Sequence, residues 1–122
     1  MELAKRIEEL TLELTGILGV VGTKDENIVT EKVFSKFMEM EYFRNNPYDL
    51  KYVELTDDKL GRKSVIATIN CNKGNSNKTV ILIGHTDTVG ISDYGDIKEY
   101  AIRPLELIDK LKKVTISEEA KT

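Results

Sequence analysis

The apolar run at residues 79–83, "TVILI", constrains the fold of this chain more than any other stretch of its sequence. Every residue in the run is apolar or β-branched and none is charged, which is typical of a strand buried on both faces. Such a strand lies inside an α/β sheet, between neighbouring strands and beneath covering helices. The run therefore predicts an α/β fold in which residues 79–83 lie near the centre of a sheet.

Two helices are predicted before this strand, and they are natural covers for a sheet. The first has one apolar stripe and ends near Gly16 or Gly19, because glycine is a poor helix former. The second begins at Thr23, with Glu26 at the spacing of a capping box, and is ended by Asn45-Asn46-Pro47, because the residue before proline avoids helical angles. Apolar residues mark the stripe of the first helix at positions 3, 7, 10, 14 and 17.

The remaining segments alternate between strand and loop patterns. Residues 51–56 and 63–70 are strand-like and are joined by a turn rich in Asp and Gly, which predicts an antiparallel hairpin. Residues 90–103 mix glycine, acids and tyrosine, and an extended loop is expected there. Pro104 suits the first turn of a short helix that follows this loop.

The composition excludes several classes of protein. The 122 residues predict a single domain over positions 1–122, and a formal net charge of −3 argues against a nucleic-acid surface. The only cysteine, Cys71, excludes an intrachain disulfide and any multi-cysteine zinc site. No apolar run approaches the roughly 18 residues of a membrane span, and the N-terminus lacks the apolar core of a signal peptide. We expect a cytoplasmic protein with no membrane partner.

His85 and Asp87 follow the apolar run directly, and His85 is the only histidine. In an open α/β sheet, functional groups gather outside the carboxyl ends of the strands. Residues two apart in an extended chain point the same way, so His85 and Asp87 are predicted to share a face, with Thr86 and Thr88 on the other. Imidazole is a common metal ligand, and a carboxylate often orients its second nitrogen. The alternative is a hydrogen-bonded loop histidine with no ligand role.

Other polar residues give weaker signals. Cys71 has no identifiable acid–base partner in the sequence near it, so we do not expect it to be a nucleophile. The pair Asp57-Asp58 lies in the predicted hairpin turn, where aspartates are usually turn formers rather than catalytic acids. The sequence therefore leaves His85 and Asp87 as the candidate site.

The stretch "TVILIGHTDTVG" resembles the first metal-site motif of the co-catalytic zinc peptidases related to aminoacylase-1, acetylornithine deacetylase and succinyl-diaminopimelate desuccinylase. Further segments resemble the arginine-utilisation (RocB-type) branch of that family. These segments are "YFRNNPYDLKYVEL", "DDKLGRKSVIATI", and "HTDTVGISDYG" leading to "RPLELIDKLKK". The resemblance covers nearly the whole chain and depends on the combination of segments.

The resemblance implies the N-terminal portion of a three-layer α/β/α domain with a mixed sheet. By the same resemblance, His85 is a ligand of one of two zinc ions, and Asp87 is a catalytic-site residue that orients this histidine. The complete family site hydrolyses an amide bond of an N-acyl amino acid or a short peptide. Its two metals polarise the carbonyl and activate water, while a glutamate moves the proton.

The sequence departs from the family pattern at its C-terminal end. The bridging aspartate and the glutamate pair of the family do not occur before Thr122, and Glu118-Glu119 precedes the point where that aspartate belongs. A catalytic zinc needs about three protein ligands, and one is recognisable here. We therefore expect a truncated part of a hydrolase that is inactive alone and binds zinc weakly or not at all.

A second hypothesis is a non-catalytic α/β module that acts by self-association or partner binding. A sheet without its later strands keeps an open edge and an uncovered apolar face, and both favour association. This hypothesis predicts a homo-oligomer.

Overall fold

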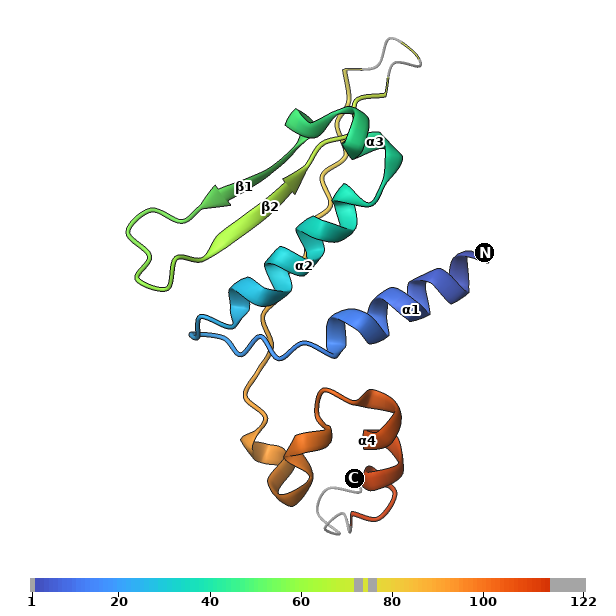
Figure 1. Ribbon diagram of the computed structural model, residues 1–122, viewed down its shortest axis with the longest axis vertical. Helices are drawn as coiled ribbons and strands as arrows, with labels where there is room; N and C mark the ends of the chain where they lie inside the picture. The colour runs from blue at the N-terminus through green and yellow to red at the C-terminus, as the bar shows by residue number, and fades with distance from the viewer. Residues whose placement is uncertain (1, 72–73, 75–76, 115–122) are drawn as a thin grey trace. The chain divides into compact units, whose positions relative to one another are not determined.

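A computed structural model describes residues 2–71, 74 and 77–114 of the chain (Figure 1). The contacts within the chain divide it into two compact units. The central unit is Gly19–Thr88, and the terminal unit combines Met1–Leu18 with Val89–Thr122. The Glu118-Glu119 pair lies outside the described residues. Each unit has its own helices, and the single domain expected from the chain length stays a prediction.

The central unit contains α2 (Glu26–Met38), which begins three residues later than its predicted start at Thr23. The Thr23 hydroxyl accepts a hydrogen bond from the Asp25 N–H at 3.3 Å, and the Glu26 carboxylate accepts one from the Gly22 N–H. Thr23 itself closes a turn, since its N–H donates to the Val20 carbonyl. The two side chains at capping-box spacing therefore organise the turn before the helix instead of capping it reciprocally.

The predicted second helix is broken into two. After α2 the backbone becomes extended at Met40 (φ −78°, ψ 136°), and a short helix, α3 (Glu41–Asn45), follows. The end at Asn45 agrees with the prediction, and Pro47 then starts a 3-10 turn, Pro47–Asp49. The break turns Phe43 inward, where it is 1% exposed and lies edge-on to the rings of Phe37 and Tyr42.

The predicted hairpin is confirmed. Strands β1 (Leu50–Glu54) and β2 (Lys63–Ala67) pair antiparallel, with Tyr52 opposite Val65. Helix α2 packs against both strands, and the ring of Phe34 stacks on Tyr52 with centroids 4.1 Å apart (Figure 1). The apolar core of the described residues is small and consists of Val29, Phe43 and Leu50.

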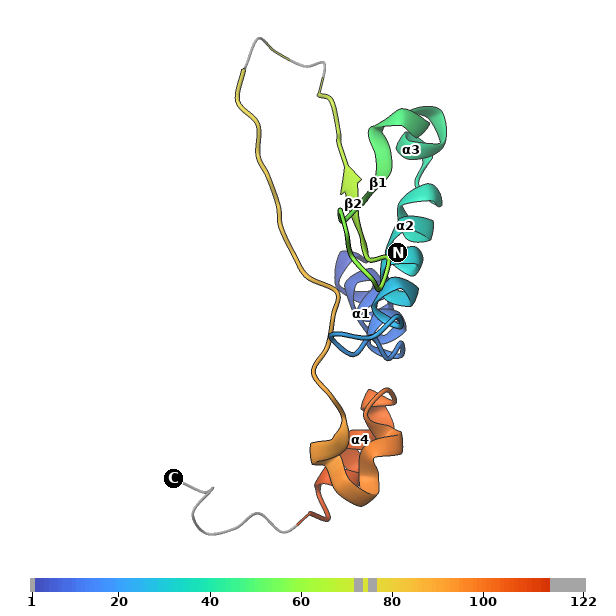
Figure 2. The same cartoon turned by 90° about the vertical axis from the view of Figure 1, so that its left-hand side faces the viewer.

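The prediction of a buried central strand at residues 79–83 is wrong for this structure. The run is an extended trace outside any sheet (Figure 2), and its four aliphatic side chains are between 76% and 92% exposed. A strand becomes part of a buried sheet only when neighbouring strands form hydrogen bonds with its edges. Among the described residues, β1 and β2 pair only with each other, so nothing flanks the run. Its C-terminal continuation is attached at Thr88, which forms a parallel bridge with Val20.

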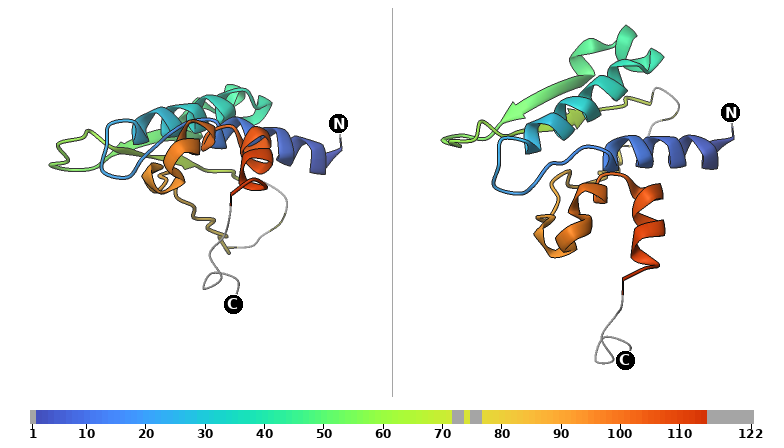
Figure 3. Two further views of the ribbon diagram at one scale, coloured as in Figure 1. Left: turned by 90° about the horizontal axis from the view of Figure 1, so that it is seen from below. Right: turned by 60° about the horizontal axis from the view of Figure 1, so that its bottom comes forward.

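The terminal unit is helical. Helix α1 (Leu3–Thr15) is followed by Gly16 and α4 (Pro104–Leu111) begins at the proline, both as predicted (Figure 3). The extended loop expected at residues 90–103 is wrong, because Ser92–Tyr100 forms 3-10 turns with a kink at Gly95. Gly95 has φ 52°, which glycine adopts without steric cost, so the chain reverses there and the turns stay compact.

The structure combines helices with a small antiparallel sheet and is compatible with the α/β class. The three-layer arrangement with a mixed sheet stays an expectation from the family resemblance. In the part of the chain that the structure describes, no helix has the length and apolar character needed to cross a bilayer.

Candidate functional site

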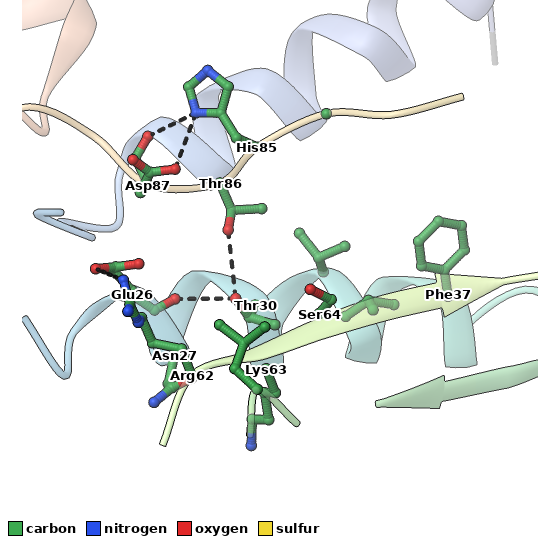
Figure 4. A pocket seen from close by; sticks show the side chains of 14 residues that line it. Glu26, Asn27, Thr30, Phe37, Arg62, Lys63, Ser64, His85, Thr86 and Asp87 are labelled. Atoms are coloured by element: carbon green, nitrogen blue, oxygen red, sulfur yellow. Dashed lines mark hydrogen bonds and ion pairs between the residues drawn. The ribbon is translucent and has the colours of Figure 1, made fainter. Parts of the chain in front are cut away.

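The central unit contains a cavity of about 330 Å³ between α2, β2 and residues 84–87 (Figure 4). One part of its wall is apolar and includes Val33, Phe37 and Val65. The other part is polar and includes Glu26 and Arg62. His85 and Asp87 also line the cavity, so the two predicted site residues belong to its boundary.

The structure brings His85 and Asp87 together. The imidazole Nδ1 of His85 lies 3.2 Å from Oδ1 of Asp87 and 3.3 Å from the Asp87 carbonyl oxygen. The side chain of His85 is 85% exposed, whereas that of Asp87 is 37% exposed. When Nδ1 carries the proton, it donates to the carboxylate, and Nε2 keeps a free lone pair. This arrangement is the one in which a carboxylate orients an imidazole toward a metal.

Two threonines fix the segment that carries the pair. The Thr86 hydroxyl lies 3.4 Å from the hydroxyl of the buried Thr30, and Figure 4 shows Thr86 directed toward α2 and His85 away from it. The Thr88 N–H donates a hydrogen bond to the Gly19 carbonyl at 2.8 Å. The Thr88 carbonyl accepts a hydrogen bond from the Val21 N–H at 2.9 Å. Asp87 is therefore held between two attached residues, although the run before it is exposed.

Arg62 is the most strongly bonded charged residue beside the cavity, and sequence reasoning missed it. Its guanidinium donates twice to the Asp58 carboxylate, at 3.0 Å each, and lies 3.8 Å from Glu26. The Arg62 guanidinium holds the pKa of Asp58 below its ordinary value. The Asp58 carboxylate in turn raises the pKa of Arg62, with smaller contributions from Glu26 and Asp87. Arg62 thus connects the hairpin loop electrostatically to the site.

Asp58 also acts as the turn former that the sequence predicted. Its carboxylate accepts a hydrogen bond from the Arg62 backbone N–H at 2.6 Å, which closes the loop between β1 and β2. Asp57 beside it has φ 58°, a conformation that aspartate tolerates better than most residues. The loop pattern predicted the turn, but no periodicity marks Arg62, because its place beside the cavity depends on its contact with Glu26 at the start of α2.

Asn27 adds one unsatisfied polar atom to the cavity wall. Its Nδ2 donates to the Leu60 carbonyl at 3.3 Å, whereas its Oδ1 is buried without a described hydrogen-bond partner. A buried acceptor without a donor is destabilising.

The described residues supply only part of a metal site. No three side chains among the described His, Cys, Asp and Glu residues gather in a way that would hold a metal ion. Cys71 is exposed and has no ring, ion-pair or disulfide partner in the described part of the chain. Beside the cavity, the donor that fits zinc best is the imidazole nitrogen of His85, oriented by the Asp87 carboxylate.

Two curated relatives are similar to this chain. Protein RocB of Bacillus subtilis (strain 168) is 35% identical over 101 residues, which cover 83% of this chain and 18% of RocB. The uncharacterized protein YqjN of the same organism is 33% identical over 104 residues, with the same coverage of both chains. No protein-family profile matches the chain, and no solved structure matches it. The chain spans less than a fifth of the length of these relatives, and it is similar in sequence to one part of RocB.

Proposed function

We propose that this chain is the N-terminal region of a zinc-dependent amidohydrolase or peptidase of the RocB type. In this proposal His85 is one ligand of a two-zinc site, and Asp87 orients its imidazole. The observation that carries the proposal is the 3.2 Å contact between His85 Nδ1 and Asp87 Oδ1, at the end of the most apolar run in the sequence. The similarity to RocB over most of the chain supports the same family.

The chain's own residues would prepare the histidine for its role. Asp87 would accept a hydrogen bond from the protonated Nδ1, which selects the tautomer whose Nε2 is free to bind a metal. The attachments of Thr86 and Thr88 limit the movement of the backbone on both sides of Asp87. When bound, the two zinc ions would polarise an amide carbonyl as Lewis acids. The remaining ligands and the general base would have to come from other parts of a longer protein.

The substrate class in this proposal comes from the family alone. An N-acyl amino acid or a short peptide would be hydrolysed at its amide bond, and the RocB similarity favours a role in arginine utilisation. With one recognisable ligand, the chain alone would be inactive and would bind zinc weakly.

The test uses the fact that His85 is the only histidine. In a sample labelled with ¹⁵N-histidine, zinc is titrated while the two imidazole nitrogens are followed by NMR. We expect zinc to shift the Nε2 signal and to leave Nδ1 protonated. Asp87→Asn should weaken zinc binding by roughly 10- to 100-fold, the usual effect of removing a partner of a metal-bound histidine.

Cys71→Ser is the matched control, because Cys71 is the other side chain with high affinity for zinc and is exposed. This variant should leave the titration unchanged, and His85→Ala should abolish calorimetric zinc binding. Zinc binding that survives His85→Ala but disappears in Cys71→Ser would contradict the assignment of His85.

A second candidate function, self-association without catalysis, is favoured by a different observation. The aliphatic side chains of residues 79–83 are exposed to between 76% and 92%, which is unusual for an uncharged run of this kind. Exposed apolar runs of high β propensity tend to pair with other chains.

A further inference from the structure

Strand β2 has one edge without a described strand partner. Its other edge pairs with β1, where the Leu55 N–H donates to the Arg62 carbonyl and the Thr68 N–H donates to the Asp49 carbonyl. In an antiparallel ladder the bonded residues alternate, so Ser64 and Ile66 direct their backbone groups toward β1. The backbone groups that point out from the free edge are those of Lys63, Val65 and Ala67.

Apolar side chains lie on both faces beside this edge, among polar ones. On the α2 side, Val33 and Phe37 line the cavity that adjoins β2. On the opposite face, Val53 is 40% exposed and Ile66 is 42% exposed, although both lie within the sheet. A strand added to the edge would therefore have some apolar neighbours on each of its faces.

No charge blocks the free edge. The Lys63 ammonium, the one charged group of β2, lies 2.8 Å from the Glu31 carboxylate and 4.5 Å from the ring centre of Tyr52. Natural edge strands often carry lysines that prevent pairing with other chains. Here the ammonium is occupied by contacts to α2 and β1, so this protection is absent.

The apolar run of the same chain has the properties of the missing strand. Residues 79–83 carry no charge, are apolar on both faces and form no strand within the chain. The chain is attached before the run at Asn70, whose N–H donates to the Tyr42 hydroxyl, and after it at Thr86 and Thr88. The run is therefore presented to solvent between two attached points.

We propose that two copies of this chain form a closed dimer in which residues 79–83 of each copy add as a strand to the β2 edge of the other. The proposal rests on the second candidate function, self-association, and is independent of zinc. Each chain carries both the strand and the edge, so the exchange is reciprocal and closes about a two-fold axis. The exchange covers the β2 edge of both copies, and each run and each β2 edge is then used within the dimer.

The exchange would bury enough surface for a stable dimer. A buried aliphatic side chain removes roughly 100 Å² from water, so the two runs together contribute roughly 800 Å². The edges and cavities that receive them lose a comparable area. The total of roughly 1,600 Å² is the standard size of a specific protein–protein interface.

The experiment is sedimentation velocity of the whole chain across the micromolar range, combined with amide hydrogen exchange followed by NMR. We expect the wild-type chain to become dimeric as its concentration rises. The amides of Lys63, Val65 and Ala67 should become protected in the dimer, whereas those of Ser64 and Ile66 are already bonded to β1 and should change little. Leu82→Lys should weaken dimerisation by at least about tenfold, because Leu82 is 92% exposed in the single chain and becomes buried on pairing.

Leu105→Lys is the matched control, since Leu105 in α4 is 64% exposed and lies outside the proposed interface. It should dimerise like the wild type. A wild-type chain that stays monomeric would overturn both self-association and this interface. Dimers that persist in Leu82→Lys, open-ended aggregates, or protection absent from the β2 amides would overturn the interface alone. His85→Ala should dimerise normally, so failure of the zinc proposal and failure of this one are distinguishable.

Discussion

The β1–β2 hairpin and the run at residues 79–83 are both extended but have opposite surroundings. Strand β2 and the run each contain valine and isoleucine, although the hairpin strands also carry charged residues and the run carries none. In the hairpin, each residue of β1 has a partner on β2, and α2 covers one face, so Leu50 is only 4% exposed. In the run, Leu82 is 92% exposed. The comparison teaches that β propensity determines the local conformation, whereas burial depends on what the rest of the chain supplies.

The largest contrast with the run should appear when an apolar side chain is removed from the small core that Phe43 of α3 forms with Leu50 of the hairpin and Val29. Phe43→Ala should lower the free energy of unfolding by about 3–5 kcal/mol, because Phe43 is 1% exposed and its loss leaves a cavity beside Phe37 and Tyr42. Leu82→Ala should change it by no more than about 0.5 kcal/mol, since its side chain is already in water. Urea unfolding of both variants, at a concentration where the chain is monomeric, measures the contrast.

Similar losses for the two variants would break the comparison, because they would mean that the run is packed in the isolated chain. Tyr48→Ala provides the control for an aromatic residue outside the core. Tyr48 is 96% exposed, and its removal should leave the unfolding free energy nearly unchanged.

The elements that the sequence predicted correctly are those whose causes are local. The turn pattern between β1 and β2 identified the hairpin, Pro104 marked the start of α4, and Gly16 marked the end of α1. Two of the errors arose where a contact between elements decides the structure. The break at Met40 depends on burying Phe43, and the strand at residues 79–83 requires neighbours that the described residues do not provide.

The candidate site also has features that the sequence predicted and features that it did not. The spacing of His85 and Asp87 predicted that they would share a face, and their contact at 3.2 Å agrees with it. The roles of Thr30 and Arg62 could not be predicted, because each depends on a partner in another element. Thr30 meets Thr86 from α2, and Arg62 lies between the hairpin loop and Glu26.

A second prediction concerns the point where the exposed segment becomes packed. An added Cβ at Gly19 would lie 2.6 Å from Val29 Cγ2, so Gly19→Ala should lower the free energy of unfolding by about 1–3 kcal/mol through overpacking. At Gly84 an added Cβ would meet nothing within 4 Å. Gly84→Ala should therefore be neutral, or stabilise by up to about 1 kcal/mol by restricting the unfolded chain.

Urea unfolding of both glycine variants locates this boundary. A loss at Gly84 equal to that at Gly19 would show that the chain is already packed before His85, which would extend the ordered region into the run. The expected contrast instead places the boundary between Gly84 and Thr88, where the Thr88 N–H bonds to the Gly19 carbonyl.

The smallest effect is expected for the ion pair between Arg62 and Asp58, which closes the hairpin loop. No such ion pair is described for the run. The bonds from Arg62 hold the pKa of Asp58 below its ordinary value of 3.8, so the folded state binds this proton less readily than the unfolded state. As the pH falls, the unfolded state is protonated first and becomes favoured. The contribution of Asp58 is therefore fully present above its ordinary pKa and is lost as the pH falls through the lowered one.

Asp58→Asn keeps an acceptor of similar shape but removes the charge, so it should lower the urea midpoint modestly at neutral pH. The difference from the wild type should shrink as both proteins are taken to pH values below the ordinary pKa of aspartate. Asp57→Asn is the control, because Asp57 has no ion pair in the described part of the chain, and its variant should keep the wild-type urea midpoint at neutral pH. A difference for Asp58→Asn that stays constant with pH would mean that loop geometry, and not the Arg62 ion pair, holds the hairpin closed. The hairpin loop would then be held closed by its backbone turn alone. The hairpin would differ from the run only in that each of its strands has a partner.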